Sequence, residues 1–276
     1  MNVQVGKGTR AIVTGASWGI GETFAQALAA RGADVLLVAR SEGRLHAIAA
    51  ELREQYKVRV EIVTVDLAAP DGPRELCEAA AALNFEPNLL VNNAGVGVLG
   101  PFEELPLERA SEMIHLNILA LTDLTYRVLT DMLARGEGAI INVGSASAFQ
   151  PLPNYGVYAA TKSYVISLTA ALWAETRKRG VRVMAVCPGA VDAGLPPGAD
   201  LTVQPKSLRK KVTREQVVAS ALAALDDDIP FVLPGAPPAV ARMALTLMPR
   251  RARLRFTGML LRKFPAMLTG IRRRDP

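Results

Sequence analysis

The sequence predicts a doubly wound α/β fold, in which helices cover both faces of one parallel sheet. Short segments that are apolar throughout alternate with longer segments of helical pattern, and strands without polar alternation are typical of a parallel sheet buried on both faces. A cluster of glycines also lies between the first apolar segment and the first helical one, where such folds turn to bind a ligand. Half of the 276 residues are hydrophobic, enough for the large core that this fold requires.

The predicted strands and helices follow one another in strict order. Strands are expected at residues 10–14, 34–39, 59–65, 88–91, 139–143, 182–186 and 230–233, each a short apolar run. Helices are expected at residues 20–31, 42–56, 70–83, 107–135, 155–179 and 213–225, and Gly32 suits the end of the first of them. Segment 194–211 is rich in Pro, Gly and Lys and is expected to be a loop. No interior linker divides the chain, so a single domain is expected.

Composition limits the compartment and the kind of site. The two cysteines, Cys77 and Cys187, are far apart and lack the spacing of metal ligands. We therefore expect no disulfide framework, no metal site and a reducing compartment. The N-terminus lacks the apolar stretch of a signal peptide, and no run of about 18 apolar residues predicts a membrane span. These features predict a cytoplasmic protein.

Charge is distributed unevenly along the chain. Residues 237–276 hold ten Lys and Arg and one Asp, whereas the preceding residues are mildly acidic. The body, residues 1–236, is therefore not expected to bind nucleic acid. In the basic amphipathic extension, residues 237–276, apolar stretches alternate with basic clusters, which fits helices lying on anionic lipid as a peripheral membrane contact. The alternative, packing of this extension on the body or on a partner subunit, is favoured.

The glycine cluster consists of Gly15, Gly19 and Gly21. Such glycines permit a turn without side-chain obstruction and a close approach of the backbone to a pyrophosphate. The N-terminus of the helix that follows offers free N–H groups to phosphates. The spacing differs from the G-x-G-x-x-G fingerprint, so the glycines alone are also compatible with a simple strand–helix turn that binds nothing.

The end of the second strand distinguishes between nucleotides. An acidic residue there would bond the ribose 2′-hydroxyl of NAD, but Ala39 is followed by Arg40 and Ser41. A guanidinium can pair with a 2′-phosphate, so NADP(H) is favoured over NAD(H), although Arg40 could also be an ordinary solvated loop residue. Trp18 stands in the turn where a basic residue would assist. Arg40 must then supply most of the charge, with Ser17 and Ser41 assisting at most.

Four polar residues are candidates for chemistry. Tyr158 and Lys162 are four apart and project from one helix face, although a Tyr-x3-Lys pair also occurs in ordinary amphipathic helices. An ammonium there would lower the pKa of the phenol and make it usable for proton transfer to a carbonyl oxygen. Ser145 directly follows the fifth strand, where a hydroxyl can bond a substrate oxygen. Asn117 is an amide among apolar helix neighbours, and its alternative interpretation is a satisfied core amide or a local kink.

Together these features resemble the short-chain dehydrogenase/reductase family, in its classical single-domain branch with a Rossmann fold, over about residues 8–235. The motifs that carry the resemblance are TGASWGIG at residues 14–21, Asp66 after the third strand, NNAG at residues 92–95, Asn117, Ser145, Tyr158-x3-Lys162 and Pro188-Gly189. The resemblance implies an NAD(P)-dependent enzyme acting on CH–OH and C=O groups. It also implies a homodimer or homotetramer, with helices 107–135 and 155–179 at an interface.

The resemblance implies a role for each site residue. Tyr158 would be the general acid in carbonyl reduction and the base in alcohol oxidation. Lys162 would bond the nicotinamide ribose and lower the pKa of Tyr158. Ser145 would hold the substrate carbonyl, and Asn117 would anchor a water in a proton relay behind Lys162. The residues implied in cofactor binding are Gly15, Ser17, Trp18, Gly19, Ile20, Gly21, Arg40, Ser41, Asp66, Leu67, Asn93, Ala94, Gly95, Tyr158, Lys162, Pro188, Gly189 and Val191.

Two observations concern the nicotinamide and the substrate. Ala193 stands where the family often has a threonine that contacts the carboxamide, so another group must clamp the nicotinamide. The candidate substrate-facing residues are mostly apolar, although several of them could simply pack the core. They are Val96, Val98, Ala146, Phe149, Leu152, Tyr155 and the loop after Ala190.

We therefore predict an NADP(H)-dependent oxidoreductase that interconverts a hydrophobic ketone and a secondary alcohol, acting as a carbonyl reductase. The alternative is a nucleotide-binding scaffold or regulator without turnover, which the complete set of Asn117, Ser145, Tyr158 and Lys162 disfavours. A sugar-nucleotide epimerase is a weaker alternative, because the sequence offers no sizeable second lobe for the sugar nucleotide.

Overall fold

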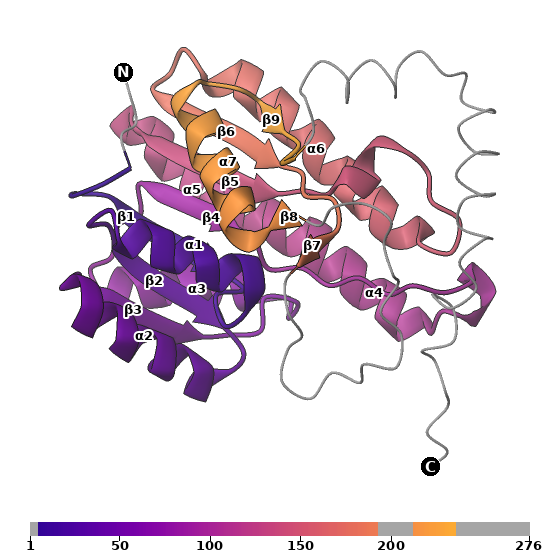
Figure 1. Ribbon diagram of the computed structural model, residues 1–276, viewed down its shortest axis with the longest axis horizontal. Coiled ribbons are helices and arrows are strands. Elements are labelled where there is room, and N and C mark those ends of the chain that lie inside the picture. Colours follow the sequence, from indigo (N-terminus) through magenta and orange to yellow (C-terminus); the bar gives the residue numbers. More distant parts are fainter. Residues whose placement is uncertain (1–4, 193–211, 236–276) are drawn as a thin grey trace.

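The computed structural model describes residues 5–192 and 212–235 (Figure 1). Three features of the sequence lie outside these residues: Ala193, the loop expected at 194–211 and the basic extension at 237–276. In the described part, each expected strand and helix is present, and their order confirms the doubly wound α/β fold. The boundaries differ from the expected ones by a few residues at most.

A seven-stranded parallel sheet lies at the centre (Figure 1). Its strands run in the order β3 (Val60–Thr64), β2 (Asp34–Ala39), β1 (Arg10–Thr14), β4 (Leu89–Asn92), β5 (Gly138–Val143), β6 (Val181–Val186) and β9 (Phe231–Val232). Every residue of β5 is buried, which explains why the strands are apolar without alternation. The strand order reverses between β1 and β4, and the carboxyl ends of strands at such a reversal form the usual ligand site of this architecture.

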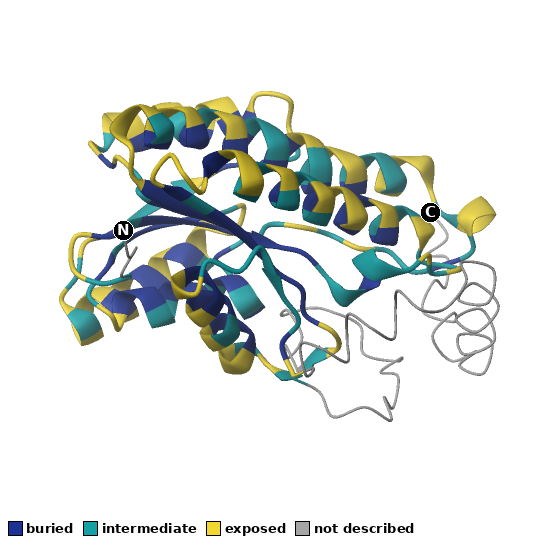
Figure 2. Ribbon diagram, turned by 90° about the horizontal axis from the view of Figure 1, so that it is seen from above, coloured by how far each residue is buried: buried dark blue, intermediate teal, exposed yellow. Residues whose placement is uncertain are grey.

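Helices cover both faces of the sheet, as Figure 2 shows. The first layer packs apolar side chains of α1 (Gly19–Ala29), α2 (Glu42–Tyr56) and α7 (Arg214–Asp226) against one face. The second layer packs α3 (Gly72–Ala82), α5 (Leu121–Arg135) and α6 (Gly156–Thr176) against the other. The two apolar cores hold the strand ends in fixed positions, so the residues that follow the strands are presented on a rigid edge.

The helix expected at 107–135 is interrupted, which corrects the prediction of one regular helix. α4 (Leu107–Ile114) is followed by a π-helical turn, η2 (His115–Ala120), before α5 begins. Single π-turns of this kind are often found at functional sites. Asn117 lies in this turn and is almost completely buried, so the amide that stood out in the sequence marks the irregularity.

The end of the described structure returns to the carboxyl edge of the sheet. The short strand β7 (Val191–Asp192) pairs in parallel with β8 (Val212–Thr213). Thr213 then caps α7, because its side chain accepts a hydrogen bond from the backbone N–H of Gln216. The side chain of Gln216 in turn accepts a hydrogen bond from the backbone N–H of Thr213. None of the described helices is long and apolar enough to cross a membrane.

Candidate active site

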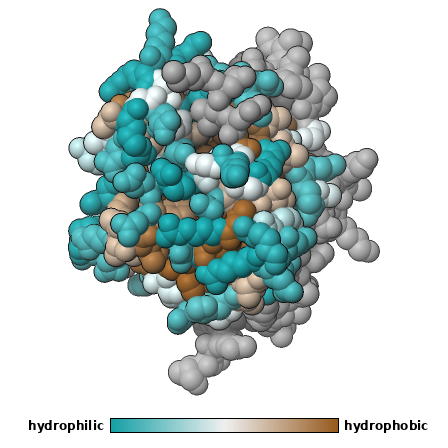
Figure 3. Space-filling view, turned by 90° about the vertical axis from the view of Figure 1, so that its left-hand side faces the viewer, coloured by the Kyte–Doolittle hydropathy of each residue, from teal (hydrophilic) through white to brown (hydrophobic). Residues whose placement is uncertain are grey.

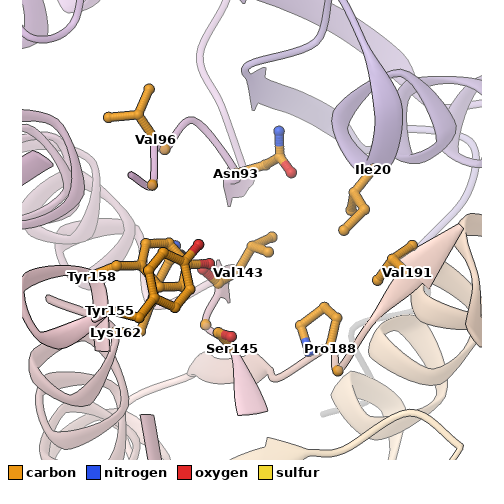
Figure 4. Close-up of a pocket in the computed structure, with 14 residues that line it drawn as sticks. Ile20, Asn93, Val96, Val143, Ser145, Tyr155, Tyr158, Lys162, Pro188 and Val191 are labelled. Carbon is orange, nitrogen blue, oxygen red and sulfur yellow. Dashed lines mark hydrogen bonds between the residues drawn. The ribbon is translucent and has the colours of Figure 1, made fainter. Parts of the chain in front are cut away.

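A cavity of about 270 Å³ opens at the carboxyl edge of the sheet. Figure 4 shows residues from the start of α1, from the ends of β4, β5 and β6 with the loops that follow them, and from the start of α6 around it. The residues that line it are Ile20, Asn93, Gly95, Val96, Gly97, Val143, Gly144, Ser145, Tyr155, Tyr158, Lys162, Pro188, Gly189 and Val191. Chain segments far apart in sequence therefore converge on one cavity, which contains most of the predicted catalytic residues.

The glycine turn after β1 is shaped by contacts that exclude side chains. A Cβ on Gly15 would lie 2.8 Å from the amide nitrogen of Asn93, and one on Gly21 would lie 2.3 Å from the carbonyl oxygen of Gly15. Gly15 and Gly19 both have a positive φ, +63° and +66°, which favours glycine. Gly19 differs from the other two because the space where a Cβ would be is open. The turn thus packs tightly against the β4 loop on its inner side and leaves its outer side free at the N-terminus of α1, a geometry that fits a pyrophosphate.

Thr14 joins this turn to the loop after β4. Its hydroxyl accepts hydrogen bonds from the backbone N–H groups of Asn93 (2.9 Å) and Ala94 (3.0 Å) and donates to the carbonyl oxygen of Val91 (3.2 Å). The side-chain amide of Asn93 in turn donates to the carbonyl oxygens of Thr14 and Gly15. These bonds hold the two predicted cofactor-binding segments in one fixed geometry. Sequence reasoning missed Thr14, although it is the first residue of the quoted motif.

Ser145, Tyr158 and Lys162 meet at the cavity. The ammonium of Lys162 donates a 2.7 Å hydrogen bond to the carbonyl oxygen of Val143 and lies 5.8 Å from the centre of the Tyr158 ring. Burial lowers the pKa of Lys162 to about 8. The hydroxyl of Ser145 accepts from the backbone N–H of Ser147 at 3.1 Å, which fixes its position.

The pKa of Tyr158 is set mainly by burial. Burial raises this pKa above the usual value of a phenol, and hydrogen bonding with the Ser145 hydroxyl offsets only part of the rise. The lowering of this pKa by Lys162, which the family resemblance implies, stays a prediction. The neutral phenol is the stable form, which suits a proton donor better than a base at neutral pH.

Asn117 clamps the loop after β4 to helix α6. Its side-chain carbonyl accepts from the backbone N–H of Val96 (3.0 Å), and its amide donates to the carbonyl oxygen of Val96 (2.9 Å) and to the Thr161 hydroxyl (3.1 Å). The Thr161 hydroxyl donates to the carbonyl oxygen of Tyr158. Asn117 thus positions the backbone on two sides of the cavity. The predicted water anchor behind Lys162 stays a prediction.

Two arginines lie at the other end of the cofactor-binding edge. Arg40 is mostly exposed and has only distant ion pairs, 3.9 Å to Asp66 and 3.9 Å to Glu112, so its guanidinium is available to a ligand. Arg44, which sequence reasoning missed, lies 5.6 Å over the Trp18 ring and pairs with Glu22 at 3.1 Å. The sequence feature that could have identified Arg44 is its position four residues after Arg40, at the start of α2.

The candidate substrate-facing residues separate into two groups. Val96 and Tyr155 line the cavity, whereas Val98 and Ala146 are not among its lining residues. Phe149 and Leu152 line a different hollow of about 720 Å³ beside the start of α6, and Phe149 packs against Phe231 with ring centres 5.7 Å apart. The structure therefore does not bring Phe149 and Leu152 to this cavity, because the end of η3 (Ala146–Phe149) and the chain after it lie beside the start of α6.

The comparisons with known proteins agree with this geometry. The family described as short chain dehydrogenase matches residues 9–199. The chain belongs to this family. A short-chain dehydrogenase from Sphingobium yanoikuyae, solved in complex with NADPH, is 31% identical with a TM-score of 0.74, covering 97% of this chain and 98% of that one. The predicted family, fold and enzyme class, a nicotinamide-dependent dehydrogenase or reductase, are confirmed.

Two further relatives act on carbonyl compounds by name. The bulky-bulky ketone specific alcohol dehydrogenase from Comamonas testosteroni is 28% identical with a TM-score of 0.74, covering 96% of each chain. The very-long-chain 3-oxoacyl-CoA reductase of Homo sapiens is 37% identical over 187 residues, which is 66% of this chain and 59% of that protein. The chain thus matches less than two thirds of the length of that reductase.

Proposed function

We propose that this short-chain dehydrogenase is an NADP(H)-dependent reductase that interconverts a hydrophobic ketone and a secondary alcohol. The observation that carries the proposal is the meeting of Ser145, Tyr158 and Lys162 in one cavity next to the glycine turn. A hydroxyl, a phenol and an ammonium so arranged can hold a carbonyl oxygen and give it a proton.

Each residue contributes one part of the reaction. Bound NADPH supplies the hydride that the carbonyl carbon receives. Ser145 holds the carbonyl oxygen, and Tyr158 donates its proton to that oxygen as the C=O bond becomes C–O–H. Lys162 favours the phenolate that Tyr158 leaves, until a proton from solvent restores the phenol. A ketone, a hydride and a proton are consumed for each alcohol formed.

The cofactor is NADP(H), as the NADPH-bound relative and the residues at the adenosine end both indicate. The cradle fits it, because the turn at Gly15 and Gly21 has no room for a Cβ while Gly19 is open toward the position of the phosphates. Arg40 would bind the 2′-phosphate, and Asp66 would contact the adenine. Pro188 and Val191 line the cavity and would contact the nicotinamide end.

The lining of the cavity supports a hydrophobic substrate. Among the lining residues that are not assigned to the cofactor, Val96 and Val143 contribute aliphatic surface, and no described residue of the lining other than Lys162 is charged. The ketone and 3-oxoacyl substrates in the names of the two relatives agree with this chemistry. We therefore place the substrate among bulky or acyl-chain ketones.

NADPH oxidation with a panel of hydrophobic ketones tests the proposal. We expect Tyr158→Phe to lower kcat by at least about a hundredfold, with little change in NADPH affinity measured by fluorescence. Equal rates in the wild type and in Tyr158→Phe would overturn the catalytic assignment. NADPH binding without turnover of any ketone would instead support the scaffold alternative.

A homodimer or homotetramer in the cytoplasm is part of the same proposal. Large apolar side chains are exposed along α4, η2, α5 and α6, a surface that we call the α4–α6 face; they are Leu107, Ile114, Leu119, Tyr126 and Tyr164. The side of the molecule drawn in Figure 3 is, by contrast, mostly hydrophilic with smaller apolar areas. An exposed apolar helical face of this kind marks an interaction surface, and we assign it to a second copy of the chain.

The basic extension at 237–276 lies outside the described residues, and its role is a separate proposal. We favour packing on the body or on the partner subunit over contact with anionic lipid. Flotation with phosphatidylserine vesicles, with and without residues 237–276, separates the two. Co-flotation of the full chain alone would favour the membrane.

A further inference from the structure

Tyr155 brings a second phenol into the cavity, and the proposed reaction does not use it. It lies directly before α6, three residues ahead of Tyr158, and its ring stacks on the Tyr158 ring with centroids 4.4 Å apart and planes inclined by 21°. Figure 4 shows both hydroxyls on the same side, directed toward the cavity. The two rings therefore act as one aromatic pair with two neighbouring hydroxyls.

Gly97 holds this pair in place. A Cβ on Gly97 would lie 2.6 Å from the Tyr155 hydroxyl and 2.8 Å from the edge of the Tyr158 ring, so the backbone itself is the wall against both rings. The preceding residue, Val96, is bonded through both its N–H and its carbonyl oxygen to Asn117. The wall is therefore fixed by the π-turn, and the two phenols have little freedom to move apart.

The Tyr155 hydroxyl has the properties of a binding group. Burial, and secondly the neighbouring Tyr158, raise its pKa well above the usual value of a phenol, so it is a neutral donor at pH 7. No described residue forms a hydrogen bond with this hydroxyl, which lies beside the Tyr158 ring and the backbone of Gly97. A substrate that fills the cavity displaces water from this donor, so a substrate acceptor at this point restores a hydrogen bond that the hydroxyl would otherwise lose.

We propose that Tyr155 donates a hydrogen bond to a second oxygen of the substrate, beside the carbonyl that is reduced. The stacked rings place their hydroxyls side by side at the cavity, so two donors face neighbouring acceptors such as the two oxygens of a 1,3-dicarbonyl compound. The preferred substrates are then 3-oxo esters or 3-oxo thioesters rather than plain ketones. The inference rests on the proposed function, since it needs the reduced carbonyl at Ser145 and Tyr158.

A pair of matched substrates tests it. Ethyl 3-oxohexanoate and 4-nonanone have the same chain length and the same position of the reduced carbonyl, and only the first has a second carbonyl. We expect Tyr155→Phe, which keeps the stacked ring, to lower kcat/KM for the ester by roughly tenfold, mainly through KM, because one hydrogen bond is lost. The value for 4-nonanone should change by less than about twofold.

The control is Tyr56→Phe, which removes a phenol hydroxyl at the end of α2, outside both the cavity lining and the α4–α6 face. It should leave the kinetics with both substrates unchanged. An equal loss with both substrates in Tyr155→Phe would show that Tyr155 only positions Tyr158, and no loss with either would show that it does not contact the substrate. Either result overturns the inference while the proposed function stands. A wild type that reduces neither substrate would overturn the proposed function itself.

Discussion

Burial opposes ionisation in both members of the Tyr158–Lys162 pair. It lowers the pKa of Lys162 to about 8 and raises that of Tyr158, so the pair is an ammonium beside a neutral phenol at pH 7. Reduction removes the proton from Tyr158, and the charged Lys162 favours the resulting phenolate. Deprotonation of Lys162 removes the positive charge that favours the phenolate.

We therefore expect kcat/KM for ketone reduction to fall as the pH rises through about 8, by up to tenfold for each pH unit beyond it if the neutral amine gives no support. Initial rates with NADPH between pH 6 and pH 10 measure this directly. Lys162→Met should be slower and should lack the break near pH 8. A wild-type profile that is flat from pH 7 to pH 9 would contradict the assignment.

Coenzyme selectivity is also decided by single residues. Arg40→Ala should weaken NADPH by roughly ten- to a hundredfold, as expected for the loss of a charge-assisted hydrogen bond, and leave NADH nearly unchanged. Arg44→Ala is the matched control, because Arg44 packs on Trp18 and pairs with Glu22. It should weaken both coenzymes alike by loosening the turn that binds their common pyrophosphate. Dissociation constants of NADPH and NADH, measured by titration, test this prediction. A loss of affinity for NADPH alone in Arg44→Ala would show that Arg44, and not only Arg40, selects the coenzyme.

At the scale of elements, the strands were predictable because their apolar runs are buried on both faces, and β1, β2 and β5 lie within one residue of the expected positions. The interruption at η2 was not predictable from periodicity. A π-turn keeps the apolar pattern of the helix on either side, and its cause is a contact between Asn117 and the distant Val96. The role of Gly97 and the stacking of Tyr155 could not be predicted for the same reason. Both depend on contacts between the loop after β4 and α6, which are distant in the sequence.

The clamp at η2 leads to a prediction for this element. Asn117→Ala would leave the N–H and carbonyl of Val96 without their partner and remove a bond to Thr161. We expect the free energy of unfolding to fall by roughly 2–4 kcal/mol, because buried polar groups lose their hydrogen bonds, and reduction to slow as well. Unfolding in denaturant, without NADPH, measures the change in the free energy of unfolding. A loss of activity with unchanged stability would instead support the water-anchoring role that the family resemblance implies.

For the whole molecule, the mildly acidic body and the basic extension could be separated from composition, and family membership followed from motifs spread over the chain. The resemblance also implied a homo-oligomer with helices 107–135 and 155–179 at an interface, but it did not give the residues of the α4–α6 face, because their apolar side chains come from several helices. Leu107, Ile114 and Leu119 precede Tyr126 along one helical stretch, and Tyr164 lies on α6. Contacts between α5 and α6, such as the 3.0 Å bond between the Thr122 and Tyr164 hydroxyls, join them into one surface.

This surface makes the assembly testable. Tyr126 is 72% exposed on α5, and a charge there would be desolvated in an interface between two copies. We expect the wild type to be a dimer or a larger even assembly by light scattering, and Tyr126→Glu to raise the dissociation constant at least about a hundredfold. Phe102→Glu is the control, since Phe102 is similarly exposed but lies in η1 (Phe102–Glu104), outside the α4–α6 face. A wild-type monomer at micromolar concentration, or an equal effect of both substitutions, would show that the α4–α6 face does not bind a second copy.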